Sequence, residues 1–427
     1  MTWRVLSRPR VPYTLLQHRS YIKSPSLFSI LHPAYTIFRP TSHLSNRQPK
    51  IIDSARKIEE ETLPGYVAER YYPAYIGQVF NSRYRVVTKL GFGATSTVWL
   101  CRDVRENRYL TLKLHTRTNH PIRELQIMKH LQSIQQRHGG KKYIRVALDS
   151  FQVEGPHGIH HCLVYEPAGM DMNELLDVFE GTLPVAVHRT AIRSVLVALS
   201  YLHKSNVVHT DVQPNNILLS LDNDDEFVLD ELANSETTNP TPRKHLHNRT
   251  VYTSRYMPIT TGELVLCDLG EARILQRNKK QDGLIMPNAY RAPEILLDME
   301  WDEKADIWAV GQTAWSLFEK GHIFPNRPLE TDLDHAHRFA EMISLLGPPP
   351  FEFLRRSEES LKFWDEHGNW RGAVPIPEGS LEDRECQLEG RDKVVFLGFI
   401  RRALCWVPKE RASARDLMCD EWVRGWL

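Results

Sequence analysis

Two short polar stretches, each placed after an apolar run, constrain this chain more than any other feature. The first lies between apolar runs at 207–208 and 217–219. It carries Asp211 and, five residues later, Asn216, so both side chains are expected around one turn. The second is Asp268-Leu269-Gly270. Carboxylate and amide oxygens are hard ligands that suit Mg²⁺, although an Asp and an Asn in an ordinary polar turn are the alternative.

The pattern of apolar residues changes along the 427-residue chain. Runs rich in Val, Leu, Thr and aromatic residues predict strands, namely at 84–90, 96–103, 108–115, near 144–153 and at 160–165. Apolar residues at helical spacing then predict a helix that starts near Pro121 and ends at Gly139. After Gly169 helical spacing dominates, for example over 188–204, while the polar stretch 221–260 is expected to be a loop or spacer. The layout predicts an α+β fold with a β-rich first lobe (about 71–168) and an α-helical second lobe (about 169–427).

A glycine-containing turn, Gly91-Phe92-Gly93, lies between two of the expected strands. Glycines let the backbone approach phosphate oxygens closely, and its N–H groups can meet their charge. Ser96 stands where a third glycine would complete the GxGxxG pattern, so an ordinary turn is the alternative here. Lys113 follows Gly93 by 20 residues, and Glu124 comes 11 residues after Lys113 on the expected helix.

Taken in order along the chain, these stretches resemble the motifs of eukaryotic protein kinases. The stretch 207–219 resembles the catalytic loop, and Asp268-Leu269-Gly270 resembles the D-F-G element with Leu in place of Phe. Later stretches resemble the A-P-E element, the helix below the catalytic loop and a late Arg-containing segment; they are Tyr290–Glu294, Asp306–Gly311 and Pro408–Ala412. The resemblance implies the bilobal protein kinase fold, with ATP and Mg²⁺ as cofactors.

The resemblance also implies a role for each matched residue. Asp211 would accept the proton of the substrate hydroxyl, and Asn216 and Asp268 would hold Mg²⁺. Lys113, paired with Glu124, would reach the α- and β-phosphates of ATP. The implied nucleotide-binding residues are Leu90, Gly91, Gly93, Ser96, Val98, Thr111, Lys113, Glu166, Ala168 and Leu218. Plain core packing is the alternative for Val98 and Leu218, and a buried pair of Arg411 with Glu294 would be structural.

Within the kinases, the chain is similar to the SR-protein kinases, which phosphorylate arginine/serine-rich splicing factors. The resemblance rests on the lead-in Ile76–Tyr84, on Ser96–Leu100 after the glycine turn, on Thr at position 210 of His-Thr-Asp, and on a spacer after Leu219. It covers about 71–427. It implies a serine/threonine kinase that acts as a monomer on protein substrates of the Arg/Ser-rich class, without binding nucleic acid, in the cytoplasm or nucleus.

Four departures and absences bear on activity. Gln213 replaces the Lys that touches the γ-phosphate in most Ser/Thr kinases, and Asn215 replaces a Glu that helps to read basic substrates. Thr210 cannot read a phosphorylated activation loop, and 268–294 contains no Ser or Thr, so activity independent of activation-loop phosphorylation is expected. A pseudokinase that binds ATP as a scaffold, and a small-molecule phosphotransferase, are the alternatives.

The N-terminal region differs from the rest in charge. Residues 1–52 hold eight Lys or Arg and no acid, whereas the whole chain has a net charge of +1. Such a segment is typical of a mitochondrial transit peptide, and a basic tail within 1–60 is the alternative. The six cysteines form no CxxC pair, so reduced thiols are expected, and no run of 18 apolar residues predicts a membrane span.

Overall fold

The computed structural model describes residues 48–118, 122–222, 225–276 and 281–425. They form two compact units. Among described residues, unit 1 contains 48–118, 148–168 and 221–262 apart from 223–224, and unit 2 contains the others. The predicted transit peptide or basic tail falls mostly in 1–47, and Pro121 was the predicted helix start; both lie outside the described residues.

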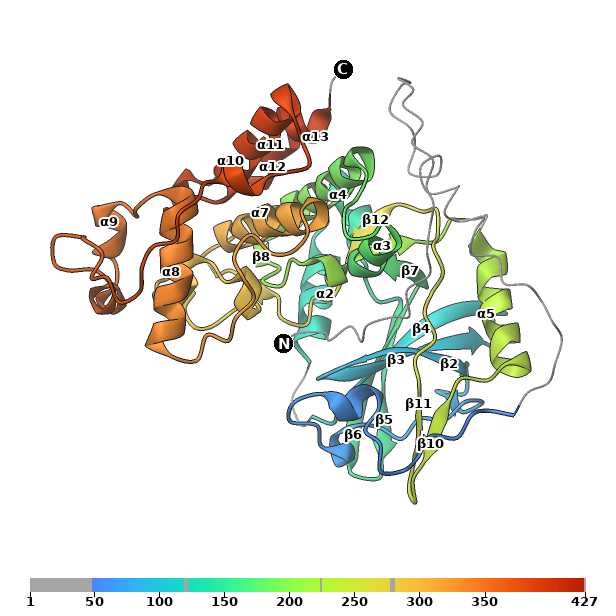
Figure 1. Cartoon of the computed structure of the whole chain (residues 1–427). Helices are drawn as coiled ribbons and strands as arrows, with labels where there is room; N and C mark the ends of the chain where they lie inside the picture. The colour runs from blue at the N-terminus through green and yellow to red at the C-terminus, as the bar shows by residue number, and fades with distance from the viewer. Residues whose placement is uncertain (1–47, 119–121, 223–224, 277–280, 426–427) are drawn as a thin grey trace. The chain divides into compact units, whose positions relative to one another are not determined.

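Unit 1 is built on a six-stranded antiparallel sheet in the order β1-β2-β3-β4-β6-β5 (Figure 1). Its strands are β1 (Val79–Phe80), β2 (Tyr84–Gly93), β3 (Ser96–Asp103), β4 (Arg108–His115), β5 (Asp149–Gly155) and β6 (Gly158–Tyr165). The strands predicted at 84–90, 96–103 and 108–115 are confirmed. They form there because β-branched and aromatic residues favour the half-buried surface of a sheet. The strand predicted from residue 144 begins only at Asp149.

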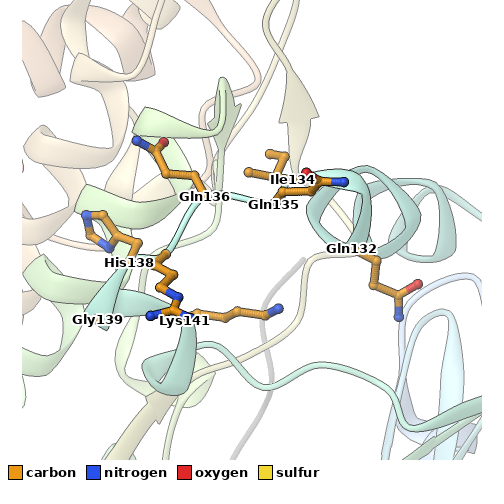
Figure 2. Close-up of a pocket in the computed structure, with 8 residues that line it drawn as sticks. Gln132, Ile134, Gln135, Gln136, His138, Gly139 and Lys141 are labelled. Carbon is orange, nitrogen blue, oxygen red and sulfur yellow. The ribbon is translucent and has the colours of Figure 1, made fainter.

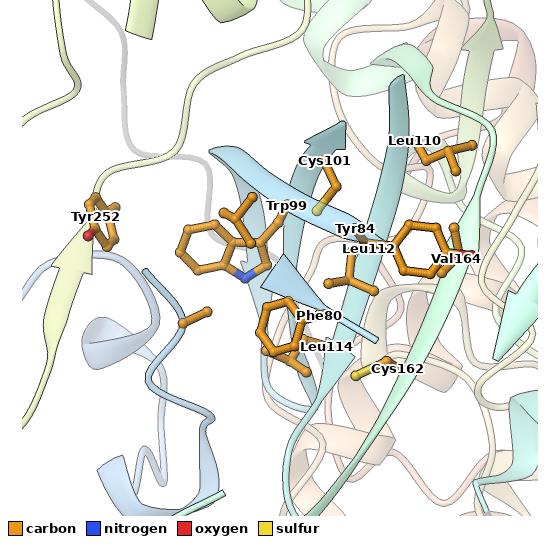
Figure 3. Close-up of a cluster of buried hydrophobic side chains, with 12 residues drawn as sticks. Phe80, Tyr84, Trp99, Cys101, Leu110, Leu112, Leu114, Cys162, Val164 and Tyr252 are labelled. Carbon is orange, nitrogen blue, oxygen red and sulfur yellow. The ribbon is translucent and has the colours of Figure 1, made fainter. Parts of the chain in front are cut away.

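The core of unit 1 lies on one face of this sheet (Figure 3). Trp99 on β3 is 3% exposed, and its ring centroid lies 5.8 Å from that of Tyr252 in an edge-on arrangement. Tyr252 comes from the stretch predicted to be a loop, 153 residues after Trp99. Burial of an aromatic ring stabilises the folded state by about 1–3 kcal/mol. The distant segment therefore completes the core of unit 1.

The prediction of a loop over 221–260 is wrong. The segment contains helix α5 (Glu226–Thr238) and the hairpin of β10 (Arg243–His245) with β11 (Thr250–Tyr252). It belongs to unit 1, and the backbone N–H of Arg255 donates to Lys89 O on β2 at 2.8 Å. The polar sequence gives no sign of this structure, because a charged residue such as Lys244 is buried against a partner that lies far away in the sequence.

A strap formed by residues 50–62 packs on the same insertion. The Ile52 N–H donates to Arg243 O at 2.9 Å, and the Arg243 N–H donates to Lys50 O at 3.0 Å. Lys244, which is 3% exposed, donates from Nζ to Glu61 Oε1 at 2.6 Å and to Arg56 O at 3.0 Å. The strap and the insertion thus neutralise each other's buried charge.

A second buried lysine joins the strap to the glycine turn. Lys89 is 1% exposed; its ammonium pairs with Glu60 and donates to Tyr252 O at 3.2 Å. The same Nζ lies 5.3 Å from the ring centroid of Phe92, the residue between the two turn glycines. Desolvated lysines of this kind are stable only with an acid partner, so the strap is part of the folded unit.

Unit 2 is mainly helical. Its helices are α2 (Arg123–Ser133), α3 (Met172–Val178), α4 (Val185–Lys204), α6 (Pro293–Leu296), α7 (Lys304–Phe318), α8 (Asp332–Leu346), α9 (Phe351–Leu354), α10 (Leu381–Arg384), α11 (Gly390–Ala403), α12 (Ala414–Met418) and α13 (Glu421–Arg424). Short strands form one sheet in the order β12-β9-β7 and a pair β13-β8; they are β7 (Ala168–Asp171), β8 (Val207–Val208), β9 (Ile217–Ser220), β12 (Leu264–Leu266) and β13 (Arg273–Ile274). The first helix ends at Ser133, six residues before the predicted Gly139.

Helices α4 and α7 form the centre of unit 2 (Figure 1). The predicted apolar face of α4, which includes Ile192, Leu196 and Leu199, is completely buried. Every residue of α7 from Ala305 to Phe318 is buried as well. Among the described residues, α4 is the one helix long and apolar enough to cross a membrane, and most of it is covered by the protein itself, as in an ordinary core helix.

A buried pair of carboxyl groups at the end of α7 makes stability depend on pH. Burial, together with a hydrogen bond to Glu385, raises the pKa of Glu319 to about 7. Glu385 Oε1 accepts backbone N–H groups of Gln387 and Leu388 at 2.7 Å, and its Oε2 lies 3.3 Å from Lys393 Nζ. The raised pKa of Glu319 thus follows from its burial beside a second carboxyl group.

Replacing Glu319 with Gln should make the folded protein less sensitive to alkaline pH. Because the folded pKa is raised, the stabilisation is present below about pH 4.5 and is lost as pH rises through about 7. We expect Glu319→Gln to gain about 1 kcal/mol over the wild type between pH 5.5 and pH 8, because the wild type loses stabilisation across that interval. Melting temperatures at both pH values, with the exposed Glu366→Gln as control, measure this. Equal pH dependence in all three proteins would contradict it.

Candidate active site

The stretch that carries Asp211 is anchored from α7. Asp306 is fully buried, and its two carboxylate oxygens accept the backbone N–H groups of His209 and Thr210 at 2.8 Å each. His203 Nε2 lies 2.8 Å from the same carboxylate. Charge-assisted bonds to a buried carboxylate are strong, so the loop has little freedom. The helix over Asp306–Gly311 therefore anchors the loop, as its motif predicts.

Thr210 occupies a strained backbone position. Its φ is +66°, a region that β-branched residues rarely adopt, and its side chain is fully buried. The hydroxyl donates to Glu271 O at 2.7 Å, three residues after Asp268. Strain of this kind costs about 1–3 kcal/mol and persists only where surrounding contacts fix it. Thr210 thus ties the Asp211 loop to the segment after Asp268.

The carboxylate of Asp211 is held on both oxygens. Gln213 Nε2 donates to Oδ1 at 2.6 Å, and Asn216 Nδ2 donates to Oδ2 at 2.8 Å. Burial raises the pKa of Asp211, with His209 opposing the rise and Asp268 adding to it. Both amides bond the ionised form, so the structure orients this group as a proton acceptor.

His209 connects the Asp211 loop to the Asp268 stretch. Its Nδ1 accepts the Asp211 N–H at 3.3 Å, which assigns the ring proton to Nε2, and Nε2 donates to Cys267 O at 3.0 Å. The antiparallel ladder of β12 with β9 has the same effect, since the Cys267 N–H donates to Asn216 O at 2.8 Å. Asn216 therefore lies beside the residue that precedes Asp268.

The donor set near Asp211 fits a divalent cation. Asn216 uses Nδ2 for both of its bonds to Asp211, so Oδ1 is the atom that could ligate a metal. Asp268 has a φ of +63°, which a short polar side chain tolerates, and its Oδ1 accepts the Gly270 N–H at 3.2 Å. One amide and one carboxylate oxygen, completed by waters or phosphates, is the kind of set that Mg²⁺ uses.

In unit 1, the glycine turn is a tight hairpin. Gly93 pairs with Ser96 and Gly91 pairs with Val98, so only two residues form the turn. The hydroxyl of Tyr71 donates to Gly93 O at 2.9 Å and is 3.1 Å from Ala94 O. A Cβ at Gly91 would meet no atom within 4 Å, and its φ is not positive, so the folded unit itself does not require glycine there. Leu90 precedes this turn on β2.

The other predicted nucleotide residues of unit 1 lie on neighbouring strands. Lys113 on β4 pairs with Val98 on β3, and Thr111 pairs with Tyr165 on β6. Thr111 is 2% exposed, and its hydroxyl has no hydrogen-bond partner among the described residues. A buried hydroxyl without a partner is costly, so this position can gain from a ligand.

The remaining predicted residues fall into both units. The side chain of Glu166 pairs with Arg108 at 2.7 Å, and Ala168 begins β7. Leu218 pairs with Val265 in unit 2. Glu124, on α2 of unit 2, is 2% exposed, and its pairing with Lys113 of unit 1 stays a prediction.

The A-P-E stretch is fixed by a buried ion pair. Arg411 donates to Glu294 through both terminal nitrogens, at 2.7 and 2.6 Å, and the two side chains are 0% and 1% exposed. Arg411 also donates to Cys405 O at 2.9 Å, and its guanidinium lies 5.0 Å from the centre of the Trp308 ring. The predicted pairing of these residues is confirmed.

A surface hollow elsewhere in unit 2 takes no part in this arrangement (Figure 2). Its volume is about 730 Å³, and it lies at the C-terminal end of α2 and along the residues that follow. None of the predicted site residues lines it; the lining residues are Gln132, Ile134, Gln135, Gln136, Arg137, His138, Gly139 and Lys141.

Two functional contacts were not predicted from the sequence. Tyr71 precedes the glycine turn by 20 residues and carries no motif that would indicate its bond to the hairpin. The sequence indicates only that Gln213 replaces a Lys, whereas in the structure its side chain donates a hydrogen bond to Asp211. The extended conformation that Pro214 imposes on Gln213 is a local signal that could have indicated this contact.

Comparison with known proteins agrees with this geometry. The protein kinase domain family matches residues 84–423. A serine/threonine protein kinase of Aspergillus fumigatus is 42% identical over 395 residues, which cover 90% of this chain and 95% of that protein. A serine/threonine-protein kinase SRPK of Physarum polycephalum is 29% identical over 84% of this chain and 90% of that protein. SRSF protein kinase 3 of Mus musculus is 36% identical over 168 residues, covering 38% of this chain and 30% of that protein.

A solved kinase domain supports the fold. Its crystal structure matches with a TM-score of 0.63 at 21% identity and covers 83% of this chain and 99% of that chain. The predicted α+β protein kinase fold is therefore confirmed. With the family match over 84–423 and these relatives, the chain belongs to the protein kinase family, as a serine/threonine protein kinase related to the SR-protein kinases.

Proposed function

We propose that this chain is an active kinase that uses ATP and Mg²⁺ to phosphorylate Ser or Thr in protein substrates of the Arg/Ser-rich class. The observation that carries the proposal is the doubly held carboxylate of Asp211, next to Asn216 and the Asp268 stretch. A scaffold that only binds nucleotide has no need to orient a proton acceptor. The relationship to SR-protein kinases supports the substrate class and a cytoplasmic or nuclear location.

In the proposed reaction, the residues of unit 2 handle the acceptor. Asp211 accepts the proton of the Ser or Thr hydroxyl as that oxygen bonds to the γ-phosphorus and the bond to the β-phosphate oxygen breaks. Asn216 and Asp268 would hold the metal ion, which would supply positive charge to neutralise the phosphates. The anchor at Asp306 keeps the acceptor group in place, so little reorganisation is needed during transfer.

The residues of unit 1 would bind the nucleotide. The backbone of the Gly91 hairpin can approach phosphate oxygens, because nothing within unit 1 occupies the space of a side chain at Gly91. Lys113 supplies a positive charge for the α- and β-phosphates. The unpartnered hydroxyl of Thr111 lies at the position expected to face adenine, which supports a polar contact there.

Activity is proposed not to need activation-loop phosphorylation. Thr210 takes the place of the Arg that would bind a phosphate, and its hydroxyl already bonds Glu271 O. Tyr290 is the one hydroxyl-bearing residue between Asp268 and Glu294. It is 5% exposed, and its ring packs edge-on against His322 with centroids 5.6 Å apart. A kinase acting upstream would find no accessible hydroxyl at this residue.

A pseudokinase is the second candidate, and Gln213 is the observation that favours it. The neutral amide adds no positive charge near the transferred phosphate, and losing one such contact typically costs about 10²- to 10³-fold in rate. Retention of Lys113, Asp211, Asn216 and Asp268 favours the active kinase.

The proposal is tested by phosphate transfer from the full chain, produced in bacteria without an upstream kinase. Transfer of ³²P from ATP and Mg²⁺ to an Arg-Ser repeat peptide and to casein is compared with Asp268→Ala, and ATP binding is measured for both. We expect transfer by the wild type only, with the Arg-Ser peptide preferred, and no gain after treatment with upstream kinases. Transfer equal to that of Asp268→Ala, with ATP still bound, would instead establish the scaffold.

A further inference from the structure

The side chain of Gln213 is placed by its own backbone. Because Pro214 follows, Gln213 is restricted to extended conformations, and its φ of −158° and ψ of 162° agree. Gln213 is 6% exposed, so its side chain is held inside the protein. The short turn Pro214–Asn216 then brings Asn216 back to the same carboxylate. The chain thus folds a five-residue segment around Asp211.

The resulting contacts use neutral donors only. Gln213 Nε2 donates to Asp211 Oδ1 at 2.6 Å, and Asn216 Nδ2 donates to Oδ2 at 2.8 Å. Each carboxylate oxygen has further lone-pair directions, so one remains to accept a proton from an incoming hydroxyl. With both oxygens tied, rotation of the carboxylate about its last bond would break one of the two hydrogen bonds.

We propose that Gln213 is a positioning residue for phosphate transfer: its amide holds the Asp211 carboxylate in the orientation that meets the substrate hydroxyl. This role rests on the proposed function and deepens it, because it assigns a function to Gln213 at the position where most Ser/Thr kinases have Lys. Misplacing a reacting group by about 1 Å can cost on the order of 10²-fold in rate, even where binding is unaffected. Gln213 therefore contributes through geometry instead of charge.

A merely structural role would have different consequences. If Gln213 only filled space beside Asp211, a side chain of similar length and volume would replace it without loss. Methionine has that length and no N–H donor, so Gln213→Met separates space-filling from hydrogen bonding. If Gln213 acts through Asp211, its replacement should also lose its effect once the Asp211 carboxylate is gone.

Five full-length proteins test this: the wild type, Gln213→Met, Gln213→Lys, Asp211→Asn and the double variant that combines Gln213→Met with Asp211→Asn. We expect Gln213→Met to lower kcat for the Arg-Ser peptide by about 10- to 100-fold, with KM for ATP and peptide within about twofold. In the Asp211→Asn background, the same change should alter the residual rate by less than about twofold. Gln213→Lys, which restores an N–H donor, should be faster than Gln213→Met.

Several outcomes would overturn the role. Equal loss from Gln213→Met in both backgrounds, or a changed KM with kcat intact, would show that Gln213 does not act through Asp211. Should Gln213→Met fail to fold, Gln213→Glu has the same length but offers an acceptor to the carboxylate; wild-type kcat in that variant would equally reject the role. A wild type no faster than Asp268→Ala would reject the proposed function itself, which is a different result from an active enzyme insensitive to position 213.

Discussion

Replacing Asp211 with Asn should lower kcat for phosphate transfer by about 10²- to 10⁴-fold, the usual contribution of a positioned proton acceptor. Asn has nearly the shape of Asp, so the loop that Asp306 anchors should keep its fold. The amide cannot take up the hydroxyl proton, and one of its two polar atoms is a donor that faces the donor of Gln213 or Asn216. ATP binding should change little, because Asp211 acts on the acceptor.

The measurement compares steady-state transfer with ATP affinity and melting temperature in the same preparations. Asp268→Ala is the matched control, since it should lose transfer together with metal-dependent ATP binding. A parallel loss of ATP affinity in Asp211→Asn, or a kcat within about threefold of the wild type, would remove Asp211 from the proposed mechanism.

Removing the guanidinium of Arg411 should destabilise the protein by about 3–5 kcal/mol, the cost of leaving a buried charge without its partner. In Arg411→Ala, the carboxylate of Glu294 would remain in a site where it is 1% exposed. The substitution also removes the donors to Cys405 O and Lys304 O and the packing over the Trp308 ring. The residues proposed to be catalytic are untouched, so the effect should appear in stability first.

A surface pair provides the control. Arg391 and Glu421 are 2.5 Å apart, but their side chains are 69% and 47% exposed. Exposed pairs of this kind contribute only about 0–1 kcal/mol, so Arg391→Ala should melt close to the wild type. Thermal unfolding of the full chain measures both variants. Similar melting temperatures for Arg411→Ala and Arg391→Ala would show that the buried pair of Arg411 with Glu294 does not stabilise the fold more than a surface pair does.

Local pattern predicted the parts of the fold where neighbouring residues decide the structure. Strands β2, β3 and β4 and helix α4 follow from apolar spacing that burial enforces directly. The end of α2 was misplaced because Gly139-Gly140 read as a stop signal. A Cβ at Gly140 would instead clash with the backbone oxygen of Val197 and with Tyr201, so the glycine serves packing against α4.

The insertion at 221–260 could not be predicted for a different reason. Its charged residues look like a solvated loop, yet Lys244 is buried with Glu61, which lies 183 residues earlier in the chain. Within the insertion itself, Glu236 lies buried between the guanidinium groups of Arg243 and Arg255, at 2.8 and 2.9 Å. Pairing between distant charges leaves no periodic trace in the sequence, so burial of these residues was invisible.

The active-site motifs were predictable in kind, and their bonding was not. Asp211, Asn216 and Asp268 follow from motif spacing, and the ladder of β9 with β12 brings Asn216 next to Cys267, beside Asp268. The bond from Gln213 to Asp211 depends on a side-chain direction that a motif does not encode. A substitution that removes a charge can therefore keep a hydrogen bond, and only geometry shows the difference.

The folded unit begins earlier in the chain than the family match, because the strap at 50–62 is part of it. The family match begins at Tyr84, yet the hairpin inside it is held by Tyr71, thirteen residues earlier. A chain cut back to the match would also lose Glu60 and Glu61, which leaves two interior ammonium groups without acids. We therefore expect the smallest part of the chain that folds by itself to include the residues that neutralise the buried lysines of unit 1. The family match alone is shorter than this part.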